Sequence, residues 1–262
     1  MLPDWIVVII LGIIEGITEF LPISSTGHLL IAGHFLKEQS ELFNVLIQSG
    51  AVLAVLPLFK ERLKMLSKFR EPASREFLAK ISVCFVLTAV GGLILKKLGL
   101  ELPETVFPVA LALIIGGILF ILVEKRLVGR PVISEITWTV AIILAGAQLL
   151  AILFPGASRS GSTILIALLL GTSRVAATEF SFLVGIPTLL SAGAYTAMKE
   201  LRAGTDENWF HLGIAFIVAS IVSFITVKWL LKFVQSHTFI GFGIYRIVLG
   251  LVLILFFSNL NS

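Results

Sequence analysis

Two stretches of the sequence decide the fold: LPISSTG at residues 21–27, the first tip, and PGASRSG at residues 155–161, the second tip. Each follows an apolar run, Trp5–Phe20 before the first and Trp138–Phe154 before the second. Proline and glycine interrupt helices, and irregular backbone at membrane depth is tolerated only where protein or a wet cavity surrounds it. The two tips therefore predict broken helices that meet at a buried polar site.

Short apolar stretches follow both tips, Leu29–Leu36 after the first and Thr163–Leu170 after the second. With a rise of about 1.5 Å per residue, neither is long enough to cross a hydrocarbon core of about 30 Å. We expect each to form the returning arm of a re-entrant hairpin that enters and leaves the membrane by the same face.

The composition indicates a membrane protein. The chain has 262 residues, of which 57% are hydrophobic and only 14% are charged, whereas about a quarter are charged in soluble domains. The apolar runs predict six full-length spans: Phe43–Phe59, Phe77–Leu95, Val106–Val123, Ala177–Met198, His211–Leu231 and Phe239–Phe257. The expected fold is an all-α polytopic membrane helical bundle, with residues 1–262 forming a single transmembrane domain.

Basic residues predict the orientation, because inner loops of membrane proteins are rich in Lys and Arg. The segments expected inside carry Lys60, Arg62, Lys64, Lys68, Arg70, Arg75, Lys80, Lys125, Arg126, Arg130, Arg174, Lys228 and Lys232. Those expected outside carry Lys37, Lys96, Lys97, Lys199 and Arg202. Each half then has three spans, and because this number is odd the second half inserts in the opposite orientation. Residues 136–262 are therefore expected to be an inverted-topology repeat of residues 1–125. The first hairpin dips from outside and the second from inside, so that their tips can meet.

Glu15 and Glu19 precede the first tip and are four residues apart, so they share one face of a helix. Each carboxylate at mid-bilayer costs about 2.5–3.5 kcal/mol, which favours a functional role. Two carboxylates at this spacing repel, so we expect one to be protonated or a cation to lie between them. The alternative is a pair that bonds to hydroxyls of a neighbouring helix.

The first tip adds hydroxyls and an imidazole. Ser24, Ser25 and Thr26 precede Gly27 and His28. At least one hydroxyl is expected to cap the second arm, which leaves the others for a substrate. His28 could act as an acid or base near neutral pH, or it could be a core histidine bonded to a carbonyl.

The second tip predicts an anion site. A helix that begins there presents free N–H groups and the positive end of its dipole. Arg159 adds a guanidinium that can hold phosphate oxygens in a bidentate manner. The alternative is an Arg159 that only neutralises Glu15 or Glu19. The remaining candidate contacts to the substrate are Ser24, Thr26, Gly27, Gly156, Ser158, Ser160, Gly161 and Thr163.

Three further polar residues are weaker candidates for substrate binding. Gln48 and Glu179 lie near the ends of two spans and could instead anchor the interface or bond to a hairpin. Arg246 lies deep in the last span and needs a partner. An ion pair with an acid such as Glu179 is favoured for Arg246 over contact with substrate.

Residues 15–28 resemble the EGxTEFLPxSSTGH signature of the undecaprenyl-diphosphate phosphatase family, also called bacitracin resistance proteins, and residues 155–163 resemble its PGxSRSGxT motif. The resemblance implies hydrolysis of undecaprenyl diphosphate to the monophosphate in the bacterial plasma membrane, which recycles the carrier lipid for cell-wall synthesis. It also implies a site open to the outer face. The resemblance further implies that the catalytic residues are Glu15, Glu19, Ser25, His28 and Arg159.

The expected ligands and partners rest on this resemblance and on the composition. It implies a divalent cation, Mg²⁺ or Ca²⁺, for which Glu15 and Glu19 are the candidate ligands. The polyprenyl diphosphate lipid and the bilayer are the expected partners, with no organic cofactor and no nucleic acid, and a homodimer stays open. The rival hypothesis is a transporter or lipid flippase, because inverted repeats with broken helices are also a transporter plan. A purely structural subunit would leave the buried charges unexplained.

Overall fold

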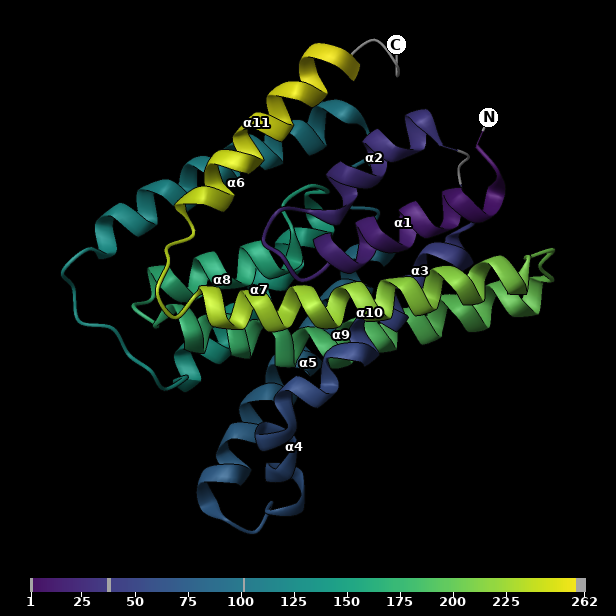
Figure 1. Ribbon diagram of the computed structural model, residues 1–262. Helices are drawn as coiled ribbons and strands as arrows, with labels where there is room; N and C mark the ends of the chain where they lie inside the picture. The colour runs from purple at the N-terminus through teal and green to yellow at the C-terminus, as the bar shows by residue number, and fades with distance from the viewer. Residues whose placement is uncertain (1, 37–38, 101, 258–262) are drawn as a thin grey trace.

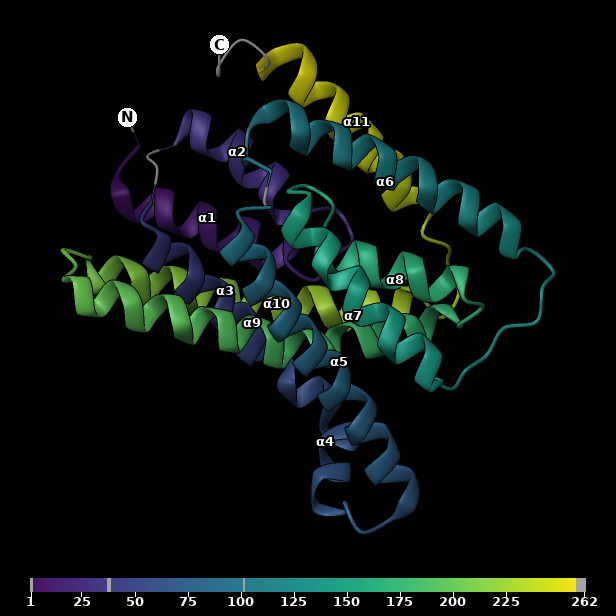
Figure 2. The ribbon, with the colours of Figure 1, turned by 180° about the vertical axis from the view of Figure 1, so that it is seen from behind.

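The computed structural model describes residues 2–36, 39–100 and 102–257, and the described chain is built from helices (Figures 1 and 2). The helices are α1 (Asp4–Thr18), α2 (Ser25–Phe35), α3 (Glu41–Val55), α4 (Lys60–Ser67), α5 (Pro72–Leu98), α6 (Val106–Leu127), α7 (Trp138–Leu153), α8 (Arg159–Leu169), α9 (Arg174–Ala203), α10 (Trp209–Phe233) and α11 (Ile240–Phe257). A short 3₁₀ segment, η1 (Leu56–Phe59), joins α3 to α4.

Six helical stretches of the described chain are long and apolar enough to cross a membrane. One of them is Glu41–Ser67, in which α3, η1 and α4 follow one another, and the others are α5, α6, α9, α10 and α11. Each coincides with one of the six runs expected from the sequence. The prediction of an all-α polytopic bundle is confirmed.

Both interrupted segments fold as pairs of short helices. α1 and α2 have 15 and 11 residues, and α7 and α8 have 16 and 11. The chain turns at the first tip between α1 and α2 and at the second tip between α7 and α8. The re-entrant placement of these pairs and the division into inverted repeats stay predictions. Lys37, which the charge distribution places outside, lies outside the described residues.

The packing brings the two broken segments to the middle of the bundle. α6 and α11 pair along their lengths, α1 packs on α10, and α7 packs on α5 (Figures 1 and 2). α1 and α10 approach closely at Gly16, where a Cβ would lie 2.7 Å from the carbonyl oxygen of Ala219. α4 and the start of α5 project away from the bundle (Figure 1). Each first arm therefore packs against a helix of the opposite half of the chain.

Apolar side chains fix the position of the tips. Leu21 and Ile23 of the first tip are buried in the same cluster as Ile164 of α8. In that cluster the rings of Phe20 and Phe182 meet edge to face, with their centroids 4.9 Å apart. Burial of these groups holds the polar residues beside them in the interior.

Candidate active site

Both tips contain a serine in an unusual backbone conformation. Ser24 and Ser158 have φ of 70° and 67° and are the only non-glycine residues with positive φ in the part of the chain that the structure describes. Each caps the following helix, since Ser24 Oγ accepts from the N–H of Gly27 at 3.4 Å and Ser158 Oγ accepts from that of Gly161 at 3.1 Å. The prediction that one hydroxyl of the first tip is a helix cap is confirmed. Such backbone costs about 1–3 kcal/mol and persists only where its surroundings enforce it.

This geometry predicts an unequal response to two substitutions of Ser158. Ser158→Ala removes the cap but keeps a Cβ at positive φ, so it should lower the free energy of unfolding by about 1 kcal/mol. Ser158→Gly also removes the cap but relieves the backbone, so its cost should be smaller. Thermal unfolding in detergent measures both. At Ser173, which caps α9 with φ of −63°, the advantage of glycine over alanine should be smaller, and an equal advantage at the two sites would contradict a strained Ser158.

Glu19 is the centre at which three elements meet. Its Oε2 accepts hydrogen bonds from Ser25 Oγ at 3.2 Å and from Gln48 Nε2 at 3.1 Å. Its Oε1 lies 3.8 Å from Nη2 of Arg159. One buried carboxylate thus joins α2, α3 and the second tip.

Glu15 lies one turn before Glu19 and is also buried, with 2% of its surface exposed. Its carboxyl group interacts with that of Glu19, while its Oε1 has no hydrogen-bond partner among the residues that the structure describes. Two buried carboxyl groups in contact share a proton or a cation, because both cannot stay ionised alone. Among the described residues no group of three or more His, Cys, Asp or Glu side chains could hold a metal ion. A cation at this pair would therefore take its other ligands from neutral oxygens, water or substrate phosphates, as Mg²⁺ and Ca²⁺ do elsewhere.

Arg159 has unused hydrogen-bonding capacity in the interior. Its Nη1 donates to the carbonyl oxygen of Ser181 at 3.2 Å, and its guanidinium lies 5.9 Å from the centroid of the Phe20 ring. Its Nε and Nη2 are buried without a hydrogen-bond partner. Since an unpaired buried donor is costly, these N–H groups are available for the oxygens of a bound anion.

A cavity of about 610 Å³ lies beside this cluster. Its polar lining includes Glu15, Ser25, Thr26 and Gln48. The other lining residues are Leu11, Leu29, Leu30, Gly33, Gln39, Glu41, Asn44, Val45 and Glu104. Acidic and hydroxyl groups next to leucine side chains suit a ligand with a polar head and an apolar tail.

His28 is bonded within the protein and is not among the residues that line this cavity. Its Nδ1 lies 2.7 Å from the carbonyl oxygen of Ser24, and its Nε2 lies 2.7 Å from the hydroxyl of Tyr245. A carbonyl can only accept, so Nδ1 carries a proton. The structure thus shows a histidine bonded to a carbonyl, and a catalytic role for His28 stays a prediction.

The hydroxyls beyond Arg159 are also engaged within the protein. Ser160 Oγ donates to the carbonyl oxygen of Leu21 at 3.1 Å, which ties the second tip to the first. Thr163 Oγ1 donates to the carbonyl oxygen of Arg159 at 2.8 Å and lies 2.5 Å from Ser181 Oγ. These two hydroxyls hold the cluster together, and their contact with substrate stays a prediction.

Glycines at the tips allow close packing of the protein itself. Gly156 has φ of 91°, and a Cβ there would lie 2.6 Å from the carbonyl oxygen of Val109. A Cβ at Gly161 would lie 2.9 Å from Nη1 of Arg246. Their expected approach to a ligand stays a prediction, as does that of Gly27.

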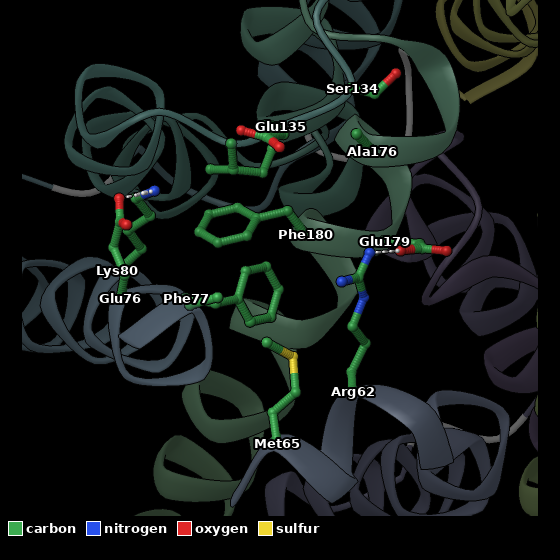
Figure 3. Close-up of a pocket in the computed structure, with 12 residues that line it drawn as sticks. Arg62, Met65, Glu76, Phe77, Lys80, Ser134, Glu135, Ala176, Glu179 and Phe180 are labelled. Carbon is green, nitrogen blue, oxygen red and sulfur yellow. Dashed lines mark hydrogen bonds and ion pairs between the residues drawn. The ribbon is translucent and has the colours of Figure 1, made fainter. Parts of the chain in front are cut away.

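The structure does not bring Glu179 to this cluster. Glu179 forms an ion pair with Arg62 at 3.0 Å, and both line a separate cavity of about 270 Å³ that also includes Phe77 and Phe180 (Figure 3). Glu179, near the start of α9, contacts Arg62 of α4 and lines this cavity together with Phe77 of α5 (Figure 3).

The expected ion pair of Arg246 with an acid such as Glu179 is wrong. Arg246 is fully buried and forms no ion pair among the described residues. Its guanidinium donates to backbone carbonyl oxygens at 3.0–3.4 Å, those of Pro22, Ala112, Leu113, Gly156 and Ala157. Backbone carbonyl oxygens of the two tips and of α6 therefore accept the hydrogen bonds of Arg246 that an acidic side chain was expected to accept.

Sequence reasoning missed one buried carboxylate. Glu124 is fully buried near the end of α6 and accepts from Arg174 Nε at 2.9 Å and Nη2 at 2.5 Å. It also accepts from the N–H of Phe239, just before α11, at 2.8 Å. The available signal was a lone acid followed by two basic residues, Lys125 and Arg126, at the end of an apolar run.

Comparison with known proteins identifies the family. Residues 8–252 match the sequence model of a family described as bacitracin resistance protein BacA. The chain belongs to the BacA family. A relative from Rhizobium johnstonii named undecaprenyl-diphosphatase is 53% identical over 255 residues, which are 96% of each chain. One of that name from Xylella fastidiosa is 48% identical over 250 residues, 94% of this chain and 96% of the relative. The BacA resemblance noted in residues 15–28 and 155–163 is confirmed.

Proposed function

We propose that this chain hydrolyses undecaprenyl diphosphate to undecaprenyl phosphate and inorganic phosphate, and so recycles the carrier lipid for cell-wall synthesis. The observation that carries the proposal is the contact of Glu19 with Ser25, Gln48 and Arg159 beside a cavity of about 610 Å³. Relatives 53% and 48% identical over nearly the whole chain are named for this activity. The protein is a multi-pass membrane protein, as its six long apolar helices require.

The geometry suits phosphoryl transfer, in which proteins mainly position groups and stabilise charge. Arg159 offers phosphate oxygens its Nε and Nη2, which form no hydrogen bond among the described residues. In the covalent route, Ser25 Oγ attacks the terminal phosphorus and passes its proton to Glu19, the carboxylate to which it already donates. The anhydride bond breaks, the lipid monophosphate leaves, and water then cleaves the phosphoserine. In the alternative route Ser25 orients a water that attacks directly.

Glu15 and Glu19 are the residues that would hold a divalent cation, Mg²⁺ or Ca²⁺. The buried Glu15 Oε1 without a partner supports this. A cation there would neutralise charge on the phosphates. The protein's own groups still orient the head and move the proton.

The proposed site opens to the outer face of the plasma membrane. Gln39 and Glu41 line the cavity near the connection between α2 and α3, and Glu104 lines it from the connection between α5 and α6. The excess of Lys and Arg on the opposite connections favours an outer position for these two. This orientation matches a lipid diphosphate released on the outer leaflet.

The direct test uses the purified protein in detergent with a polyprenyl diphosphate and follows inorganic phosphate, with and without a chelator. We expect phosphate release, and a loss on chelation that added Mg²⁺ or Ca²⁺ reverses. Absence of phosphate release with and without added cation would refute the proposed function. Release that a chelator does not alter would refute the cation alone.

Ser25→Ala decides between the two routes. If Ser25 is the nucleophile, kcat should fall by about 10³-fold or more, because loss of a nucleophile removes the reaction path. Near-normal turnover would leave direct attack by water. Ser220→Ala is the matched control, because Ser220 donates only to the carbonyl of Phe216 within α10, and it should leave turnover near that of the unchanged chain.

A further inference from the structure

Two adjacent residues of α11, Tyr245 and Arg246, contact the tips without lining the cavity. The proposed chemistry uses neither of them. Arg246 is fully buried, whereas Tyr245 is 44% exposed. The hydroxyl of Tyr245 is bonded to His28, and the guanidinium of Arg246 is bonded to backbone carbonyls, so the polar groups of both residues are engaged within the protein.

Arg246 joins the two tips through their backbones. Its Nη1 donates to the carbonyl oxygen of Pro22 at 3.1 Å. Its Nη2 donates to the carbonyl oxygens of Gly156 at 3.2 Å and Ala157 at 3.0 Å. A planar guanidinium with five N–H donors can hold several acceptors in one fixed arrangement. One side chain thus sets the separation and orientation of the two tips.

Tyr245 reaches the first tip by way of His28. The hydroxyl of Tyr245 lies 2.7 Å from His28 Nε2, while His28 Nδ1 donates to the carbonyl of Ser24 at 2.7 Å. The two rings are nearly parallel, at 8°, with centroids 5.6 Å apart. Since Nδ1 carries the proton of a neutral ring, Nε2 accepts from the tyrosine hydroxyl.

The carbonyls held in this way adjoin the two strained serines. Ala157 directly precedes Ser158, and the carbonyl of Ser24 is held by His28. The next residue after each serine is a group of the proposed chemistry, Ser25 in the first tip and Arg159 in the second. Fixing these peptide planes therefore fixes the two side chains that meet at Glu19.

We propose that Tyr245 and Arg246 form a positioning clamp, which holds the two tips so that Ser25 and Arg159 converge on Glu19. The inference rests on the proposed function. It assigns neither residue to the substrate, and it gives His28 the role of a brace between Tyr245 and Ser24.

Arg246→Lys tests the clamp with its charge retained. An ammonium group cannot reach the carbonyls of both tips at once. We expect kcat for phosphate release to fall by about 100-fold, because a small misplacement of reacting groups lowers the rate by about that factor. KM should change little. Arg202→Lys, at the exposed end of α9, is the matched control and should retain turnover.

Tyr245→Phe keeps the ring and removes only the hydroxyl, so the fold is retained. We expect kcat to fall by about tenfold, the effect of one lost hydrogen bond. In a His28→Ala background the same change should have little further effect, because the tyrosine acts through His28. The chain has 2 tyrosines, and Tyr195→Phe, at an exposed residue of α9, is the control.

The outcomes separate the clamp from the function on which it rests. If the unchanged protein releases phosphate and Arg246→Lys and Tyr245→Phe match their controls, the clamp is wrong. A rise in KM at unchanged kcat would also overturn it, because that result indicates contact with the substrate. Failure of the unchanged protein to release phosphate would overturn the proposed function itself, and the clamp with it.

Discussion

Arg159→Ala should lower kcat/KM for phosphate release by about 10³-fold, the effect of removing a preorganised donor from a buried site. The guanidinium forms an ion pair with Glu19, and within the described part of the chain its buried Nε and Nη2 have no hydrogen-bond partner. The protein should remain folded, because Glu19 keeps its bonds from Ser25 and Gln48. Phosphate release and the midpoint of thermal unfolding, measured on the same preparation, separate the two effects.

Two further variants sharpen this prediction. Arg159→Lys keeps the charge but loses the bidentate fork, so its activity should lie between those of the alanine variant and the unchanged protein. Arg62→Ala removes an arginine from the separate cavity of Figure 3, where it pairs with Glu179, and should leave turnover almost unaltered. Unchanged phosphate release by Arg159→Ala would defeat the idea of an anion clamp in the second tip.

The parts of the fold that sequence could predict are those in which one residue type has one physical consequence. Long apolar runs predicted the six helices because a membrane span requires them. Pro22 and Pro155 predicted the interruptions because proline ends a helix, and both lie in turns between short helices. The contact of Arg159 with Glu19 follows from the expectation that the two tips meet.

The parts that sequence could not predict depend on backbone acceptors or on distant pairs. Arg246 finds carbonyls instead of an acid, and every residue carries a carbonyl, so no sequence pattern marks these partners. Glu179 pairs with Arg62 near the start of α4, and periodicity does not show a contact between residues so far apart in the sequence. Gln48 was expected to contact either the interface or a hairpin, and the sequence did not indicate which; its amide donates to Glu19 at the end of α1.

Glu124→Ala should cause the largest loss of stability. Its carboxylate is fully buried and is shared by Arg174 and the N–H of Phe239. Its removal leaves the buried N–H of Phe239 without an acceptor, which costs about 1–3 kcal/mol, whereas the side chain of Arg174 is 33% exposed and can be solvated. For a chain of this size that corresponds to a fall of about 5 °C in the apparent midpoint of thermal unfolding.

Glu124→Gln refines this expectation, because the amide oxygen can still accept from Phe239 but no longer neutralises Arg174. Its loss of stability should be smaller than that of the alanine variant. Glu61→Ala is the control, since the ion pair of Glu61 with Lys64 is exposed and such pairs contribute little. Because Glu124 does not line the cavity beside Glu19, kcat measured below the midpoint should stay near that of the unchanged protein. A variant with lower kcat at full stability would show instead that the junction of α6, α9 and α11 acts on the chemistry.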